Sequence, residues 1–125
     1  MNNIGLHKSS EEITDDEIAK TAEIILNGGV VGVCNNEAEA GPRALGNRSL
    51  IALANSKEIA KKVSVNIKKR EWYRPIAPIM LSHNAEKVSQ QPSNPLSKFM
   101  LLDFTIKKEY YSALEGVIPP GERLT

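Results

Sequence analysis

The stretch TDDEIAKTAEIILNGGVVGVC, residues 14–34, decides the expected fold class. Thr14, followed by a glutamate three residues later, forms a capping box that predicts the start of a helix. Gly28 predicts its end, because glycine adopts the left-handed cap conformation without strain. The β-branched run at residues 30–34 then predicts a buried strand. Apolar residues recur at helical spacing and are expected to face the core: Ile18, Ala22, Ile25 and Leu26.

Further helices and strands are expected to alternate along the chain. LIALA, residues 50–54, is either a second strand or a short helix, since periodicity cannot decide over so short a run. KFMLLDFTI, residues 98–106, predicts a third strand. Ser56 predicts the N-cap of a helix over residues 57–67, with this inner face: Ile59, Ala60, Val63 and Ile67. Interleaved helices and strands indicate the α/β class, with a twisted mixed sheet flanked by helices.

The composition is that of one globular domain of 125 residues, with 41% hydrophobic and 25% charged residues. The single cysteine and the two widely separated histidines provide neither a disulfide framework nor the spacing of metal ligands, so no metal site is expected. No apolar stretch approaches the length of a membrane span. Residues 1–13 are expected to be a flexible acidic lead-in, unlike a signal peptide. These features predict a cytoplasmic protein without a membrane partner.

Positive charge is concentrated in one part of the sequence. The net charge is only +1, but residues 41–74 hold nine lysines and arginines against Glu58 and Glu71. A basic stripe on a nearly neutral chain predicts a local anionic partner rather than a general coat for nucleic acid.

The centre of this basic stripe is EAGPRALGNRSL, residues 39–50. Pro42 fixes one backbone angle, so Arg43 is expected on a stiff, exposed turn. Gly46 permits a second bend that would bring Arg48 close to Arg43. Because guanidinium groups bind phosphate or carboxylate through paired hydrogen bonds, the loop is a candidate oxyanion clamp.

A structural interpretation of the same loop stays open. Its arginines can instead cap helix ends or pair with Glu37 and Glu39. Ser49 is either an N-cap residue or a phosphate ligand.

A second basic stretch is NIKKREWYRP, residues 66–75. If the backbone is extended, Lys68, Arg70 and Arg74 point the same way and form a row of cations. Trp72 shares their parity and is placed to stack on a base or a guanidinium. The alternatives are a solvated basic face and an aromatic core anchor.

Together these stretches resemble the C-terminal domain of the carbamoyltransferase family, which includes nodulation-factor and antibiotic O-carbamoyltransferases. The resemblance rests on EAGPRALGNRSLIA at 39–52, VNIKKREWYRPIAPIML at 65–81 and FMLLDF at 99–104. It covers about residues 15 to 104. The glycine pair before the first strand and the Lys68–Arg70 spacing are also similar to YrdC-like proteins.

The resemblance implies a partial YrdC/Sua5-like architecture and a specific chemistry. Such a domain uses ATP, with Mg²⁺, and carbamoyl phosphate as substrates to form carbamoyl-adenylate, and a metal-containing Kae1-like domain passes the carbamoyl group to an acceptor hydroxyl. The implied catalytic residues are Lys68 and Arg43. The implied ligands of carbamoyl phosphate and ATP are Arg43, Arg48, Ser49, Lys68, Arg70, Arg74 and Arg123.

The family pattern also implies what this sequence lacks. Residues 14–125 are expected to form the carbamoyltransferase C-terminal-like domain, incomplete at its C-terminal end and without the Kae1-like domain. Asn36 and Glu37 stand where the family has Gly-Arg, and Ser64 replaces an asparagine. A Kae1-like partner domain or subunit is therefore expected, and transferase activity of the isolated chain is not. The alternative is a non-catalytic YrdC-like remnant that binds nucleotide or RNA through its basic surface.

Overall fold

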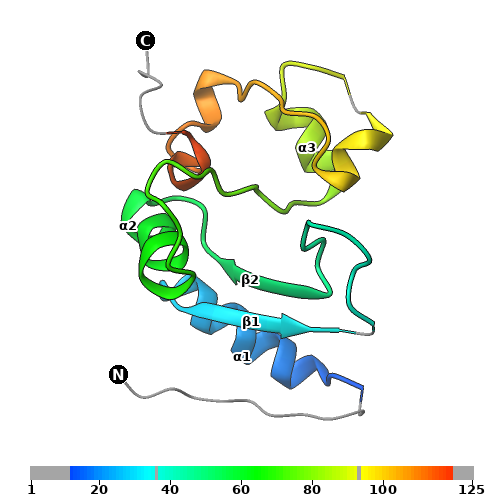
Figure 1. The fold of residues 1–125 in the computed structure, drawn as a ribbon, viewed down its shortest axis with the longest axis vertical. Coiled ribbons are helices and arrows are strands. Elements are labelled where there is room, and N and C mark those ends of the chain that lie inside the picture. Colours follow the sequence, from blue (N-terminus) through cyan, green and yellow to red (C-terminus); the bar gives the residue numbers. More distant parts are fainter. Residues whose placement is uncertain (1–11, 36, 93, 120–125) are drawn as a thin grey trace.

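The computed structural model describes residues 12–35, 37–92 and 94–119. A helix, a two-stranded hairpin and a second helical segment come first, and a more irregular segment follows them (Figure 1). The regular elements of the described residues are α1 (Asp15–Leu26), β1 (Val30–Cys34), β2 (Arg48–Ala52), α2 (Lys57–Lys61) and α3 (Ser82–Val88). A π-helix (Lys62–Ile67) continues α2, and short 3₁₀ segments lie at Pro95–Phe99, Lys108–Tyr110 and Glu115–Val117.

The ends of α1 are set by the predicted local signals. The Thr14 hydroxyl accepts a hydrogen bond from the Glu17 N–H, and the Glu17 carboxylate accepts one from the Thr14 N–H. Loss of such a cap costs about 1 kcal/mol. At the other end Gly28 has φ +76°, and its N–H donates to Ile25 while that of Gly29 donates to Ile24. This is the Schellman arrangement, which satisfies two helix carbonyls that would otherwise lack partners.

The sheet of the described residues is a single antiparallel hairpin. Val30 pairs with Ala52 and Cys34 with Arg48. The first three residues of LIALA, 50–52, therefore lie in a strand and not in a helix. The helices and strands agree with the α/β expectation at a coarse level, but the sheet is two-stranded and antiparallel instead of larger and mixed. In Figure 1, α1 lies below β1, and residues 75–92 and 94–119 lie above the hairpin.

The second helical segment confirms the prediction over residues 57–67 and adds a π-helix. The Ser56 hydroxyl caps α2 by accepting from the N–H groups of the second and third residues after it. Lys62 then donates from Nζ to the Gly28 carbonyl, 3.2 Å away, which ties this segment to the end of α1. Gly116 donates to Ala54 at 2.7 Å, and a Cβ at Gly116 would meet backbone oxygens at 2.7–2.8 Å. This close approach seats the Glu115–Val117 turn beside α2.

The buried core is small. Within the described residues, only Val63, Val88 and Ile118 are buried hydrophobic side chains. The Ser64 hydroxyl is also buried and has no hydrogen-bond partner there. The prediction of the inner helix faces is wrong in part. Four side chains that were expected to face the core are exposed, because nothing in the described residues covers them: Ile18, Ala22, Leu26 and Ile67. The strand at 30–34 is likewise only half-buried.

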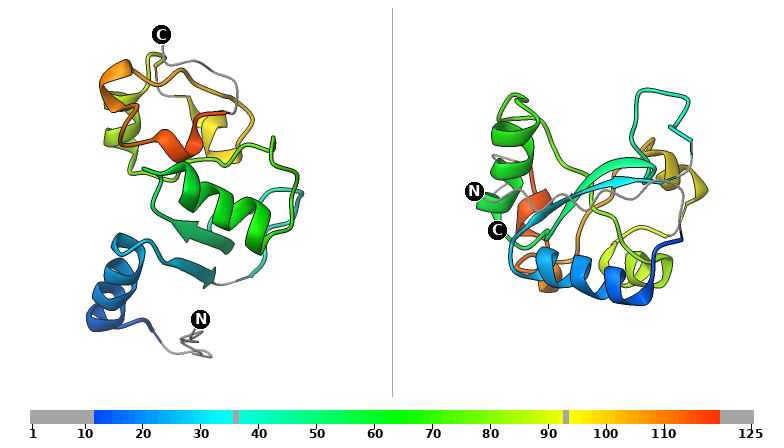
Figure 2. Two further views of the ribbon diagram at one scale, coloured as in Figure 1. Left: turned by 90° about the vertical axis from the view of Figure 1, so that its left-hand side faces the viewer. Right: turned by 90° about the horizontal axis from the view of Figure 1, so that it is seen from below.

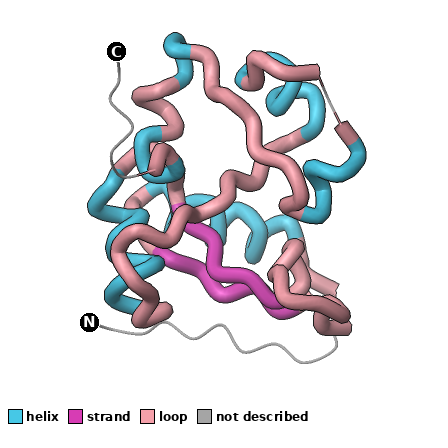
Figure 3. The backbone as a smooth tube through the Cα atoms, turned by 45° about the horizontal axis from the view of Figure 1, so that its top comes forward, coloured by secondary structure: helices cyan, strands magenta, loops and turns pink. Residues whose placement is uncertain are grey.

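The predicted third strand at 98–106 is wrong. Its first residues complete the 3₁₀ segment Pro95–Phe99, and Met100 then takes a left-handed conformation at φ 54°. Only one residue of this run forms a β-bridge, Ile106 with Ser89, and the neighbouring Thr105 carbonyl accepts a hydrogen bond from the Gln90 N–H at 2.9 Å. An apolar run becomes a strand only where a neighbour can accept its ladder hydrogen bonds. Among the described residues, Figure 3 shows strand only in the hairpin. In the described ranges, no helix is both long and apolar enough to cross a bilayer.

Candidate anion-binding site

A glutamate holds the loop between β1 and β2. Glu39 Oε1 accepts hydrogen bonds from the backbone N–H of Leu45 at 2.6 Å and of Asn47 at 2.7 Å. The N–H groups of Glu39 itself, Asn47 and Leu45 lower the pKa of the Glu39 carboxyl from 4.5 to about 2. Hydrogen bonds to the charged form explain this direction. The loop therefore keeps its shape through a carboxylate that is ionised at neutral pH.

Further bonds close the same loop. Asn35 donates to the Asn47 carbonyl at 2.8 Å, and the Asn47 side chain donates to the Glu37 carbonyl at 2.9 Å. Gly46, at φ +116°, donates its N–H to the Ser49 hydroxyl at 3.1 Å. Ser49 lies in β2, so it caps no helix. Its contact to Gly46 fixes the second bend, which needs the freedom of glycine.

The two arginines of the loop have different surroundings. Arg48 donates from one terminal guanidinium nitrogen to the carbonyls of Asn35 at 3.0 Å and Asn47 at 2.9 Å. Arg43 is exposed at the outer part of the loop and makes no hydrogen bond or ion pair with any described residue. Arg48 thus helps to shape the loop, while Arg43 is available to a ligand.

The second basic stretch is not extended, so the predicted row of cations is wrong. Lys68 follows the π-helix in a helical conformation, and Lys69 reverses the chain at φ 53°. Arg70 donates its backbone N–H to the Ser64 carbonyl at 3.0 Å, which fastens this reversal to the π-helix. A left-handed residue breaks the alternation of an extended strand, and residues with even numbers no longer share a face.

The turn Glu71–Arg74 follows directly, and within it the last cation of the stretch, Arg74, forms an ion pair. The Arg74 N–H donates to the Glu71 carbonyl at 3.1 Å, and Arg74 Nε lies 2.6 Å from the Glu71 carboxylate. The backbone N–H of Glu71 and the Arg74 guanidinium lower the pKa of the Glu71 carboxyl below its ordinary value. Trp72 and Tyr73 at the apex of this turn are exposed, so the core-anchor alternative is wrong.

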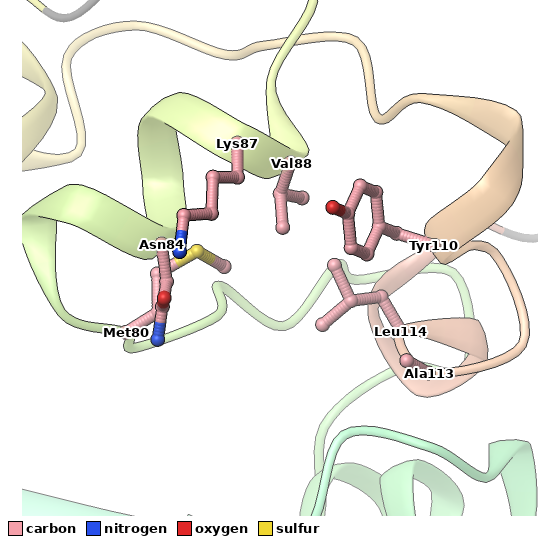
Figure 4. Close-up of a pocket in the computed structure, with 7 residues that line it drawn as sticks. All are labelled: Met80, Asn84, Lys87, Val88, Tyr110, Ala113 and Leu114. Carbon is pink, nitrogen blue, oxygen red and sulfur yellow. The ribbon is translucent and has the colours of Figure 1, made fainter.

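The described residues do not bring the predicted cations into one pocket. The Arg43 loop lies at one end of the hairpin, and the segment after α2 lies at the other end (Figures 1 and 2). Arg123 lies outside the described residues. Two pockets of about 260 and 380 Å³ lie elsewhere, between α3 and the segments that follow it. Figure 4 shows the smaller one, where Lys87 and Tyr110 approach from opposite walls.

Glu39 and Glu71 are the residues that sequence reasoning missed. The sequence suggested only that Glu39 pairs with an arginine, whereas it binds backbone N–H groups. No pattern signals that role. Glu71 and Arg74 stand three residues apart, and this spacing is a readable sign of an ion pair. Among the described residues, no group of three His, Cys, Asp or Glu side chains is placed to hold a metal ion.

Comparison with known proteins identifies the family. Residues 22–119 match the family described as carbamoyltransferase C-terminus. An uncharacterized protein of Methanocaldococcus jannaschii is 33% identical over 97 residues, covering 78% of this chain and 16% of that protein. Nodulation protein NolNO of Sinorhizobium fredii is 36% identical over 95 residues, covering 76% of this chain and 14% of its own. Nodulation protein U of Azorhizobium caulinodans is 30% identical over 102 residues, covering 82% of this chain and 18% of that protein.

These relatives are much longer than the matched region. The chain spans between 14% and 18% of their lengths. The match extends over most of this chain and includes both basic stretches. The chain therefore belongs to the carbamoyltransferase C-terminal family.

Proposed function

We propose that this chain supplies the ATP- and carbamoyl phosphate-binding part of an O-carbamoyltransferase. It would form carbamoyl-adenylate, which a separate Kae1-like domain or subunit would pass to an acceptor hydroxyl. Family membership supports a role in carbamoyl transfer. The observation that carries the proposal is Arg43, whose guanidinium has no partner among the described residues and stands on a loop that other residues hold in shape.

The proposed step needs fixed positive charge more than it needs a nucleophile. Water would first cleave carbamoyl phosphate into carbamate and inorganic phosphate. A carbamate oxygen would then bond to the α-phosphorus of ATP while pyrophosphate leaves, and negative charge would build up on the phosphate oxygens. Cations already held in place stabilise that charge without reorganising, and in many enzymes this effect contributes most of the rate enhancement. Mg²⁺ would arrive with the nucleotide, since the described residues offer no cluster for it.

The roles of the cations follow from what already surrounds them. We assign carbamoyl phosphate to Arg43 and the phosphates of ATP to Lys68 and Arg70, because the two segments lie at opposite ends of the hairpin. The side chains of these three cations make no hydrogen bond or ion pair within the described ranges. Arg48 and Ser49 would position the loop, since both bind its backbone. Arg74 would contribute less, because Glu71 already neutralises it.

Calorimetric titration with ATP, alone and with carbamoyl phosphate, tests this proposal. The wild-type chain should bind both ligands, and Arg43→Ala should weaken the binding of carbamoyl phosphate by at least about tenfold, since a charge-assisted hydrogen bond is lost. Lys20→Ala is the matched control. It removes one positive charge from α1, where Lys20 pairs with Asp16, and it should bind like wild type.

Two results would contradict the proposal. One is a folded wild-type chain that binds neither ATP nor carbamoyl phosphate. The other is an Arg43→Ala variant that binds carbamoyl phosphate as tightly as wild type. Equal weakening by Lys20→Ala would show that net charge alone attracts the ligand.

A second candidate function is binding of single-stranded RNA without catalysis. The exposed pair Trp72 and Tyr73 beside several cations favours it, because such proteins combine stacking platforms with basic grooves. Oligonucleotide binding that falls steeply with added salt would support this candidate over the transferase role.

A further inference from the structure

Two adjacent aromatic side chains stand open on the surface. Trp72 is 72% exposed and Tyr73 is 57% exposed. Their ring centroids are 5.9 Å apart, and the ring planes meet at 85°. This edge-to-face contact leaves most of the indole uncovered. Burial of an indole gives a large favourable free energy, which Trp72 does not gain while it is exposed to water. The surface formed by Trp72 and Tyr73 is therefore suited to bind a partner.

The aromatic pair is held in place rather than left loose. Trp72 and Tyr73 occupy the two central positions of the Glu71–Arg74 turn. That turn is closed twice, by the backbone bond from Arg74 to Glu71 at 3.1 Å and by their side-chain contact at 2.6 Å. A platform that is already ordered loses less entropy when a ligand settles on it.

The charge beside the pair selects the kind of ligand. Glu71 and Arg74 neutralise each other, so the excess charge comes from Lys68, Lys69 and Arg70 just before the turn. Lys69 sits at φ 53°, a conformation that is costly for lysine. Strain of this kind concentrates at binding sites and switches. An aromatic surface next to three cations fits a planar ring that carries phosphate groups.

We propose that Trp72 is the stacking platform for the base of a purine nucleotide, with its phosphates directed toward Lys68 and Arg70. A purine covers more of an indole than a pyrimidine does, so purines should bind more tightly. The proposal rests on the proposed function, because it names where the ATP of that reaction would hold its base.

The single tryptophan of the chain makes this stacking directly visible. ATP should quench its fluorescence in a saturable way, CTP should quench it less, and inorganic tripolyphosphate should not quench it. Trp72→Ala should weaken ATP binding by about tenfold in calorimetry, as expected for one stacked base, and leave tripolyphosphate binding unchanged. Trp72→Phe should keep most of the affinity. Phe99→Ala, which removes another exposed aromatic ring, should bind ATP like wild type.

The outcomes separate this inference from the proposed function. If Trp72→Ala binds ATP like wild type and ATP does not quench, the platform is refuted and the proposed function stands. If the wild-type chain binds neither ATP nor tripolyphosphate, both the platform and the proposed function are overturned. Quenching by a short single-stranded RNA but not by ATP would also overturn the nucleotide platform, because the turn would then bind single-stranded RNA instead.

Discussion

Two glutamates organise the two basic segments of this chain, and they do so in opposite ways. Glu39 turns its carboxylate to the backbone N–H groups of its own loop. Glu71 turns its carboxylate to the side chain of Arg74. Arg43 is consequently left open on a shaped loop, whereas Arg74 is neutralised where it stands.

The difference shows that the number of cations in a segment does not measure its capacity to bind an anion. A carboxylate satisfied by backbone donors stabilises a loop and leaves the arginines to other partners. A carboxylate paired with a guanidinium competes with any incoming phosphate for the same donors. Substitution of each glutamate tests this contrast.

The largest effect is expected from Glu39→Ala. It leaves the N–H groups of Leu45 and Asn47 without their acceptor, so their amide exchange should accelerate by at least about tenfold. NMR-detected hydrogen exchange measures this for each amide. Glu37→Ala, which removes the same charge from the same loop, should leave both rates near wild type, because the bond to Glu37 uses its backbone carbonyl.

A pH titration of Glu39 should give the next largest effect. Its folded pKa of about 2 lies below the ordinary 4.5, so its contribution to stability is complete above about pH 4.5 and is lost as the pH falls toward about 2. Glu39→Gln should lack that contribution at neutral pH. The thermal midpoints of wild type and variant should therefore differ at about pH 7 and converge in acid. A constant difference across this range would show that the carboxylate charge is not what holds the loop.

The smallest effect is expected from Glu71→Gln. The ion pair to Arg74 is half-exposed on both sides, so its loss should move the thermal midpoint by no more than about 2 °C. Because Arg74 becomes free, affinity for ATP should rise, by at most about threefold. Calorimetry measures the affinity, and unchanged or weaker binding would show that Arg74 cannot reach the ligand.

The sequence allowed correct predictions where the cause of structure is local. Thr14 with Glu17 and the glycine at 28 mark the ends of α1, and Ser56 marks the start of α2, because each acts on its nearest backbone groups. The run at 30–34 is a strand for a similar reason, since its β-branched residues favour that conformation.

The failures have non-local causes. The run at 98–106 has strand composition but only one bridging residue, Ile106. The row at Lys68, Arg70 and Arg74 fails because Lys69 takes a left-handed conformation that no propensity predicts. Within the site, the sequence identified Arg43 as exposed. It could not show that Arg48 would be bound to backbone carbonyls.

The central claim is that an anion reaches Arg43, while Arg48 and Arg74 remain engaged within the protein. NMR of the arginine Nε–H groups during titration with carbamoyl phosphate tests it most directly. The account predicts a saturable shift of the Arg43 signal, with the Arg48 and Arg74 signals nearly unmoved. Movement of Arg48 or Arg74 while Arg43 stays still would contradict it.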